Sequence, residues 1–264
     1  MTATAVDRTP RRPFPAVRHG LTLAWRSLLK IKYNPEQLID LTLQPIIFVI
    51  LFVFLFGGAV AGDWRDYLQF VLPGILVQTV VFATLGTGIG LATDIKTGIF
   101  DRFRSMPIAR SAPLVGTVAG DVVRYVVSGV VVLAFGMVLG FRIHTGPLAV
   151  LAAYGLVLAF AFALCWLAAL VGMLVKSPQS VQGFGFMTMF PLTFGSNIFT
   201  RPETLPGWLE AWVDVNPVTH LTTALRGLLL GGPVAEPVVY TLGWAAVIGA
   251  VFAPLAIRAY LRRT

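Results

Sequence analysis

The sequence predicts an all-α membrane protein with six transmembrane helices, and its composition, hydropathy and charge distribution all support this fold class. The chain of 264 residues is 56% hydrophobic and 12% charged, whereas soluble domains carry about 25% charged residues. Its mean hydropathy is +0.80. The charged residues gather in short segments between long uncharged runs, as expected of a chain that crosses a bilayer repeatedly. A water-soluble globular fold is therefore disfavoured.

Six stretches are long enough to cross the membrane. A span needs about 20 mainly apolar residues, because about 30 Å of hydrocarbon is crossed at about 1.5 Å per residue. We expect spans at residues 41–59, 68–91, 122–140, 148–174, 181–199 and 238–257. The fifth has the weakest support, because its glycines and Pro191 can interrupt a helix.

The distribution of positive charge predicts the orientation. Most of the 20 Lys and Arg residues lie before the first span, after the second and fourth spans, and after the sixth. Because Lys and Arg favour the cytoplasmic side, we expect a multi-pass protein of the cell membrane with both termini in the cytoplasm. This segregation explains the net charge of +8 without a nucleic-acid partner.

Residues 1–16 are predicted to form a cytoplasmic N-terminal arm, and residues 17–264 a single transmembrane domain. The arm is basic and proline-rich, and no apolar signal core follows it. Residues 17–32 are amphipathic and are expected to form an interfacial helix in the headgroup region. Residues 200–236 are predicted to form an external segment with helices at 206–215 and 218–230. The second of these helices is apolar enough to dip into the membrane as a re-entrant helix.

The motifs of catalysis and nucleotide binding are missing from the sequence. It contains no Gly-Lys dipeptide and hence no P-loop, no His-Glu-x-x-His pattern and no Gly-x-Ser-x-Gly pattern. Cys165 is the single cysteine, so the chain offers no multi-cysteine metal site. We therefore expect a protein that is not an enzyme and holds no cofactor of its own.

The segment after the second span carries the most specific motif. Arg104, Pro107, Ile108 and Arg110 form an Arg-x-x-Pro-Ile-x-Arg core, and an Asp-x-x-Arg pair, Asp121 and Arg124, follows at the next span. This segment resembles the first cytoplasmic loop of type 2 ABC exporter permeases, especially their daunorubicin-resistance group. Similar motifs occur at residues 34–38, 44–46, 205–209, 216–219 and 224–227.

The resemblance implies a permease subunit of an ATP-driven exporter. Such a subunit pairs with a second copy or a close relative, a homodimer being expected, and with two separate cytosolic ABC ATPase subunits that hold ATP and Mg²⁺. The expected substrate is a hydrophobic or amphipathic compound, such as a drug, a natural product or a lipid-like molecule, which leaves the cytoplasm or the inner leaflet.

A cytoplasmic coupling helix is expected between the second and third spans. Apolar anchors beside rim charges suit docking in a groove of a soluble partner, whereas the alternative is an interfacial helix whose arginines contact anionic lipid. The predicted ATPase-coupling residues are Ile99, Phe100, Asp101, Phe103, Arg104, Met106 and Pro107. Asp121 and Arg124 lie three residues apart and are expected to form a structural ion pair at the membrane edge.

A substrate path is predicted along the first, second and fifth spans, although phenylalanines at helical spacing are also typical of packing or lipid contact. The candidate residues are Gln44, Phe48, Gln78, Phe82 and Asn197. The main alternative function is a secondary carrier or channel without an ATPase partner. The uncharged runs disfavour a proton-driven or sodium-driven carrier, because such carriers usually keep an ionisable group within the membrane. A membrane scaffold and an intramembrane enzyme are further alternatives.

Overall fold

The computed structural model describes residues 35–98, 112–175 and 177–263, and the regular elements in these ranges are helices. They are α2 (Pro35–Ile50), the π-helix η1 (Leu51–Phe56), α3 (Gly57–Ala61), α4 (Trp64–Ala83), α5 (Leu85–Lys96), α7 (Ala112–Leu139), α8 (Pro147–Leu174), α9 (Pro178–Phe194), the 3₁₀-helix η2 (Pro202–Thr204), α10 (Gly207–Val215), α11 (Pro217–Leu230) and α12 (Ala235–Arg263). The predicted N-terminal arm, interfacial helix and coupling residues 99–107 lie outside the described residues.

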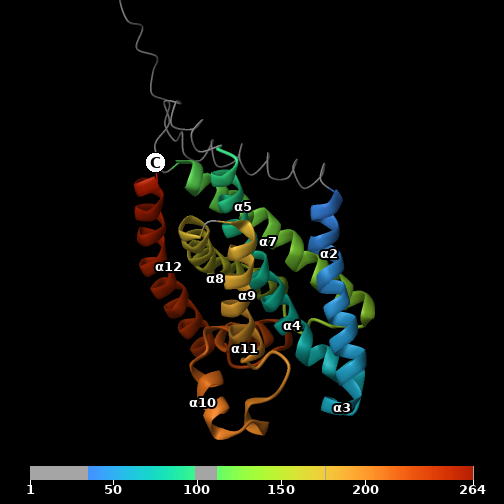
Figure 1. Cartoon of the computed structure of the whole chain (residues 1–264). Helices are drawn as coiled ribbons and strands as arrows, with labels where there is room; N and C mark the ends of the chain where they lie inside the picture. Colours follow the sequence, from blue (N-terminus) through green and yellow to red (C-terminus); the bar gives the residue numbers. More distant parts are fainter. Residues whose placement is uncertain (1–34, 99–111, 176, 264) are drawn as a thin grey trace, which may run out of the picture.

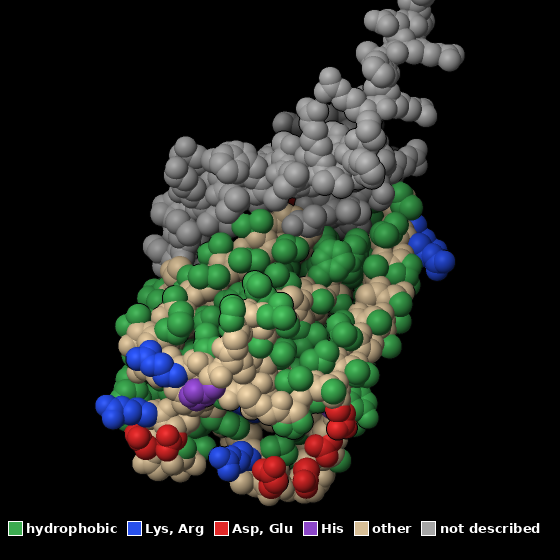
Figure 2. Space-filling view, turned by 180° about the vertical axis from the view of Figure 1, so that it is seen from behind, with side chains coloured by type: hydrophobic (Ala, Val, Ile, Leu, Met, Phe, Trp, Pro, Cys, Tyr) green, Lys and Arg blue, Asp and Glu red, His purple; other side chains and the backbone are tan. Residues whose placement is uncertain are grey.

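The long helices form a bundle with two distinct ends (Figure 1). The start of α2, the end of α5, the start of α7 and the end of α12 lie at one end, which we name the inner end after its predicted orientation. The opposite, outer end carries α3, α10 and α11. Figure 2 shows a mainly hydrophobic surface between the two ends, with most of the visible charged side chains gathered toward the outer end. This distribution matches a membrane-spanning bundle.

Five helical stretches in the described ranges are long and apolar enough to cross a membrane. They are Thr42–Ala61, Trp64–Lys96, Gly120–Leu139, Pro147–Leu174 and Ala235–Arg262. The fraction buried in the most apolar window is 72% for the second stretch and 67% for the fourth, but only 22% for the first and 11% for the fifth. The helices α4, α5 and α8 therefore form the centre of the bundle, and α2 and α12 are peripheral.

At the predicted fifth span, the helix is shorter than expected and ends earlier. Helix α9 has 17 residues, which corresponds to about 26 Å at 1.5 Å per residue. It begins with Pro178 after a Ser177 cap and ends at Phe194, before the predicted end of the span. The chain turns at Gly195, where an added Cβ would lie only 2.7 Å from the indole nitrogen of Trp212. Five of the six expected spans are thus present by length and hydropathy.

The second span is broken between α4 and α5. The Thr84 hydroxyl donates to the Val81 carbonyl oxygen at 2.7 Å. The backbone N–H of Thr87 donates to the Thr84 carbonyl oxygen at 3.1 Å, which tightens the chain locally to a 3₁₀-like turn. The next turn of α5 then lies directly on α8, because a Cβ at Gly88 would overlap the Ala168 carbonyl oxygen. The break therefore lies next to a close contact between α5 and α8.

The external segment folds as predicted into two helices. Their observed bounds, Gly207–Val215 for α10 and Pro217–Leu230 for α11, nearly match the predicted ones. Asn216 separates the two helices, and its side-chain oxygen accepts a hydrogen bond from the Val218 N–H at 2.9 Å. An Asn cap followed by Pro at the first helical position is a strong start signal, which explains why this boundary was predictable from the sequence.

Candidate functional site

Two charged side chains of α7 reach the break between α4 and α5. Arg124 Nη2 lies 3.4 Å from Asp121 Oδ1 and donates a hydrogen bond to the Ala83 carbonyl oxygen at 2.8 Å. The Thr87 hydroxyl donates to Asp121 Oδ2 at 2.5 Å and lies 2.9 Å from the Tyr125 hydroxyl. We name Thr87, Asp121, Arg124 and Tyr125 the break network. It joins α7 to both halves of the broken span.

The break creates the need for this network. In an unbroken helix the Ala83 carbonyl would accept the N–H of Thr87, but that N–H bonds to Thr84 instead. Arg124 supplies the donor that the carbonyl at the break requires. Gly86 makes the approach possible, because a Cβ there would lie 2.6 Å from Arg124 Nη1. The ion pair is thus part of a contact between helices.

Six phenylalanines join the first span to α9 and the segment after it. Phe52 lies in the π-helix η1, and its ring centroid is 4.1 Å from that of Phe199. Phe194 stacks on Phe199 at 5.1 Å and on Phe190 at 4.2 Å. The phenylalanine cluster consists of Phe48, Phe52, Phe56, Phe190, Phe194 and Phe199. It connects two elements that are far apart in the sequence.

The predicted path residues are not gathered in one place. Gln44 is exposed on α2, and Phe48 belongs to the phenylalanine cluster. Phe82 lies 5.5 Å from Phe186, measured between ring centroids. Asn197 donates to the Thr223 hydroxyl at 2.8 Å. Gln78 is buried in α4, and neither of its amide atoms has a hydrogen-bond partner among the described residues.

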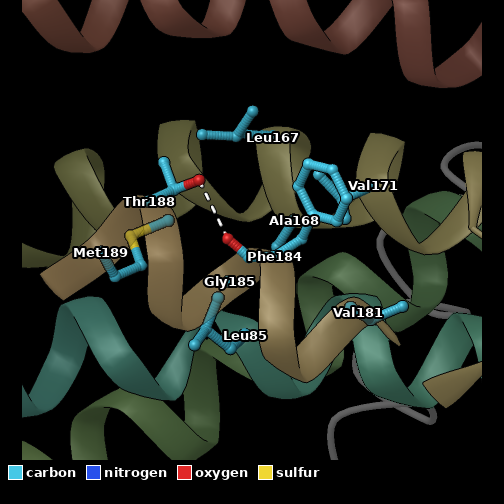
Figure 3. A pocket seen from close by; sticks show the side chains of 9 residues that line it. All are labelled: Leu85, Leu167, Ala168, Val171, Val181, Phe184, Gly185, Thr188 and Met189. Atoms are coloured by element: carbon cyan, nitrogen blue, oxygen red, sulfur yellow. Dashed lines mark hydrogen bonds between the residues drawn. The ribbon is translucent and has the colours of Figure 1, made fainter. Parts of the chain in front are cut away.

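Helix α9 is loosely attached to the rest of the bundle. Only Val181, Gly185, Met189 and Thr193, one residue per turn, are buried in it. Figure 3 shows the crevice of about 20 Å³ where α9 crosses α5 and α8, with Gly185 next to Leu85. This space is far smaller than ordinary ligand pockets of about 300 Å³ or more. None of the predicted path residues lines it.

Arg226 of α11 fixes the outer end of the bundle. Its Nε donates to the Phe70 carbonyl oxygen at 2.9 Å, and its Nη2 donates to the carbonyl oxygens of Asn197 and Ile198 at 2.8 and 3.0 Å. The guanidinium carbon lies 3.7 Å from the Phe70 ring centroid. Burial lowers the pKa of Arg226 to about 9, which leaves the group charged at neutral pH. We name these contacts the Arg226 clamp; it ties α11 to α4 and to the turn after α9.

Comparison with known proteins decides the family. The family model described as ABC-2 type transporter matches residues 19–230. The chain belongs to this family. The permease resembles the daunorubicin resistance ABC transporter permease protein DrrB1 of Streptomyces coeruleorubidus. The two sequences are 45% identical over 245 residues, which cover 93% of the permease and 87% of the relative. It is 34% identical over 192 residues, covering 70% of it and 66% of the relative, to the doxorubicin resistance ABC transporter permease protein DrrB of Mycobacterium tuberculosis.

The family assignment confirms the resemblance stated from the sequence motifs. The matched region of the permease includes the predicted coupling residues 99–107, although these lie outside the described residues. It also includes two features that the sequence did not single out as sites. One is the Arg226 clamp, and the other is the attachment of Thr87 and Tyr125 to the predicted ion pair.

Proposed function

We propose that this permease is the membrane subunit of an ATP-driven exporter that moves a hydrophobic or amphipathic compound out of the cytoplasm or the inner leaflet. The observation that carries the proposal is the 45% identity to a named daunorubicin resistance permease over most of both chains. The apolar bundle supports it, since five stretches are suited to crossing the membrane.

The energy source is a separate cytosolic ABC ATPase in this proposal. The chain has no Gly-Lys dipeptide and therefore no P-loop, so ATP and Mg²⁺ bind to the partner. The docking element is the segment that carries the coupling residues Ile99 to Pro107. Its apolar anchors provide affinity, and Asp101 and Arg104 set the register on the partner.

The break network carries the movement of the docking segment into the membrane. Helix α5 ends at Lys96 and α7 begins at Ala112, so the docking segment is joined directly to both helices. The break network ties the same two helices together. When the ATPases close on ATP, α5 and α7 move as one unit, and the equilibrium between two arrangements of the bundle shifts.

A second copy of the permease covers the free side of α9. Met187, Phe184 and Phe190 are 79%, 60% and 51% exposed, and Leu55 and Phe56 of η1 are also exposed. Apolar side chains at membrane depth face either lipid or another protein surface. We assign this face to a homodimer with the substrate path beside it, which places the exposed Gln44 and the phenylalanine cluster near that path.

The proposed topology has six spans and cytoplasmic termini. Helix α9 with the turn at residues 195–199 serves as the fifth span, and α11 is the re-entrant element of the external segment. The common end of α2, α5, α7 and α12 then faces the cytoplasm, where the ATPase docks (Figure 1).

Reconstitution tests the proposal. The permease is placed in inside-out vesicles with and without its cytosolic ATPase, and uptake of a fluorescent amphipathic dye is followed after ATP addition. We expect uptake that requires the ATPase, ATP and Mg²⁺. Uptake by the permease alone, without nucleotide, would contradict the proposal and support a secondary carrier or channel.

A further inference from the structure

An apolar groove lies near the outer end of the bundle, between α8, α9, α10 and α12. Its volume is about 240 Å³. Its walls include Phe160 and Leu164 of α8, Leu192 of α9, Trp212 of α10, and Trp244 and Ile248 of α12. None of the five predicted path residues lines it.

The groove offers almost no polar group to an occupant. Apart from the indole N–H groups of its tryptophans, the polar side chain in its lining is that of Asn216. The Asn216 amide nitrogen donates to the carbonyl oxygens of Leu192 and Gly195 at 2.8 and 2.7 Å, and its oxygen accepts from the Val218 N–H. Because Asn216 is already engaged, the groove suits a hydrocarbon chain rather than a ligand recognised through hydrogen bonds.

Helix α10 places the mouth of the groove at the membrane surface. Trp208, Trp212 and Val215 lie on one helical face at positions i, i+4 and i+7, and they are 76%, 48% and 63% exposed. Glu210 and Asp214 lie on the opposite face. An exposed apolar face with tryptophans opposite carboxylates is typical of a helix that lies in the interface. Trp212 and Val215 also line the groove, so the groove opens on the membrane side of α10.

The groove is continuous with the exposed apolar surface of α12. Only 11% of the most apolar window of α12 is buried inside the chain, so most of this helix is free of contact with the chain's other helices. Trp244 and Ile248 of the same helix line the groove. An apolar site with so few polar partners does not hold ordered water. A helix of a second copy, about 10 Å across, is too wide for the volume.

We propose that this groove binds one acyl chain of a phospholipid in the leaflet next to α10, with the headgroup at the level of Trp208 and Trp212. The bound chain fills the space between α8, α9 and α12. It thereby supports the packing of α9, in which only one residue per turn is buried. This site is separate from the proposed path of the transported compound.

Lipid retention tests the proposal on the full chain. The purified permease is washed with excess detergent, and the phospholipid that remains is measured by mass spectrometry. We expect one retained phospholipid per chain, and we expect Ile248→Phe, which fills the groove, and Val215→Trp, which narrows its mouth, to lose most of it. The matched control is Val247→Phe, because Val247 is an exposed neighbour on α12 that does not line the groove.

Fluorescence provides a second readout in intact vesicles. Phosphatidylcholine brominated on its acyl chains quenches nearby tryptophans, and we expect less quenching in Ile248→Phe than in wild type or Val247→Phe. Replacing Trp244 by Phe should remove part of the quenched emission, whereas replacing the buried Trp166 should not. Equal retention and equal quenching in all variants would overturn the proposal. A cross-link between residue 248 of two copies would also overturn it, because a second copy would then occupy the groove.

Discussion

At the scale of single residues, the guanidinium of Arg226 is held by carbonyl groups rather than by a carboxylate. Three carbonyl oxygens from two segments accept its hydrogen bonds, and Phe70 covers its face. The planar guanidinium presents its N–H donors in a fixed fork that makes this arrangement possible, and a lysine ammonium cannot reproduce it. The charged guanidinium of Arg226 therefore has a structural role at the outer end of the permease.

We predict that Arg226→Lys destabilises the permease by about 2 kcal/mol, because hydrogen bonds from a charged group are lost at a partly buried site. Thermal unfolding in detergent measures the effect. Arg201→Lys is the matched control, since the Arg201 guanidinium lies 6.0 Å from the same Phe70 ring and its side chain is exposed. Equal unfolding temperatures for the two variants would show that the clamp contributes nothing.

Gly86 gives a second prediction at the residue scale. Gly86→Ala places a Cβ against the Arg124 guanidinium, so Arg124 must leave the Ala83 carbonyl. We expect a loss of about 1.5 to 3 kcal/mol in stability, as for the loss of a hydrogen bond from a charged group, together with reduced ATP-driven transport. Gly90→Ala on the same helix is the control, because a Cβ there meets no atom within 4 Å. A harmless Gly86→Ala substitution would contradict the geometry of the break network.

At the scale of elements, the sequence predicts some helices well and others poorly, for physical reasons. Helices α8 and α12 follow uninterrupted apolar runs, and α11 follows the Asn216 and Pro217 start signal. The break at Thr84 has no proline to announce it, and Arg124, whose guanidinium donates to the free Ala83 carbonyl, lies 41 positions after Ala83 in the chain. The Arg226 clamp depends on Phe70, 156 positions earlier. Contacts of this kind arise from tertiary packing, which local patterns do not contain.

The break network predicts a particular form of non-additivity. Asp121→Ala leaves Arg124 without its carboxylate, and we expect a loss of about 2 kcal/mol, reduced from the buried-pair value because both side chains are partly exposed. Removing both charges should cost less than the sum of the two single substitutions. A double-mutant cycle with Arg124→Ala, measured by thermal unfolding, tests this expectation. Strict additivity would mean that the two residues act independently.

The free face of α9 gives the second prediction for an element. If this face meets a second copy, Met187→Cys should form an intermolecular disulfide under mild oxidation, because Met187 is 79% exposed. The native Cys165 is buried and does not interfere. Val239→Cys on the outer part of α12 is the control, since Val239 is also well exposed but lies on another helix. A dimer that forms only with the control cysteine would place the interface on α12 instead.

At the scale of the whole molecule, the two ends of the bundle differ in what they join. Helix α5 ends and α7 begins at the inner end (Figure 1), and the chain between them carries the predicted coupling residues. At the outer end, the Arg226 clamp fixes α11 to α4 and to the turn after α9. A movement of α5 and α7 at the inner end would therefore act on helices that the break network joins to each other and that the Arg226 clamp holds at the outer end. This arrangement suits the proposed transfer of movement from the inner end to the outer end.

This arrangement predicts how the coupling residues behave. Phe103→Ala removes an apolar anchor, and we expect the association of the cytosolic ATPase to weaken about tenfold, as for the loss of a moderate hot spot. ATP-driven dye uptake should fall in parallel, while thermal stability stays close to wild type, since the substitution acts at the docking surface. Ser105→Ala, within the same segment, is the control and should leave both properties unchanged. If Phe103→Ala retained normal ATPase binding and normal uptake, the docking segment would have no part in the transport cycle. The ATPase would then have to act on the permease through another cytoplasmic surface.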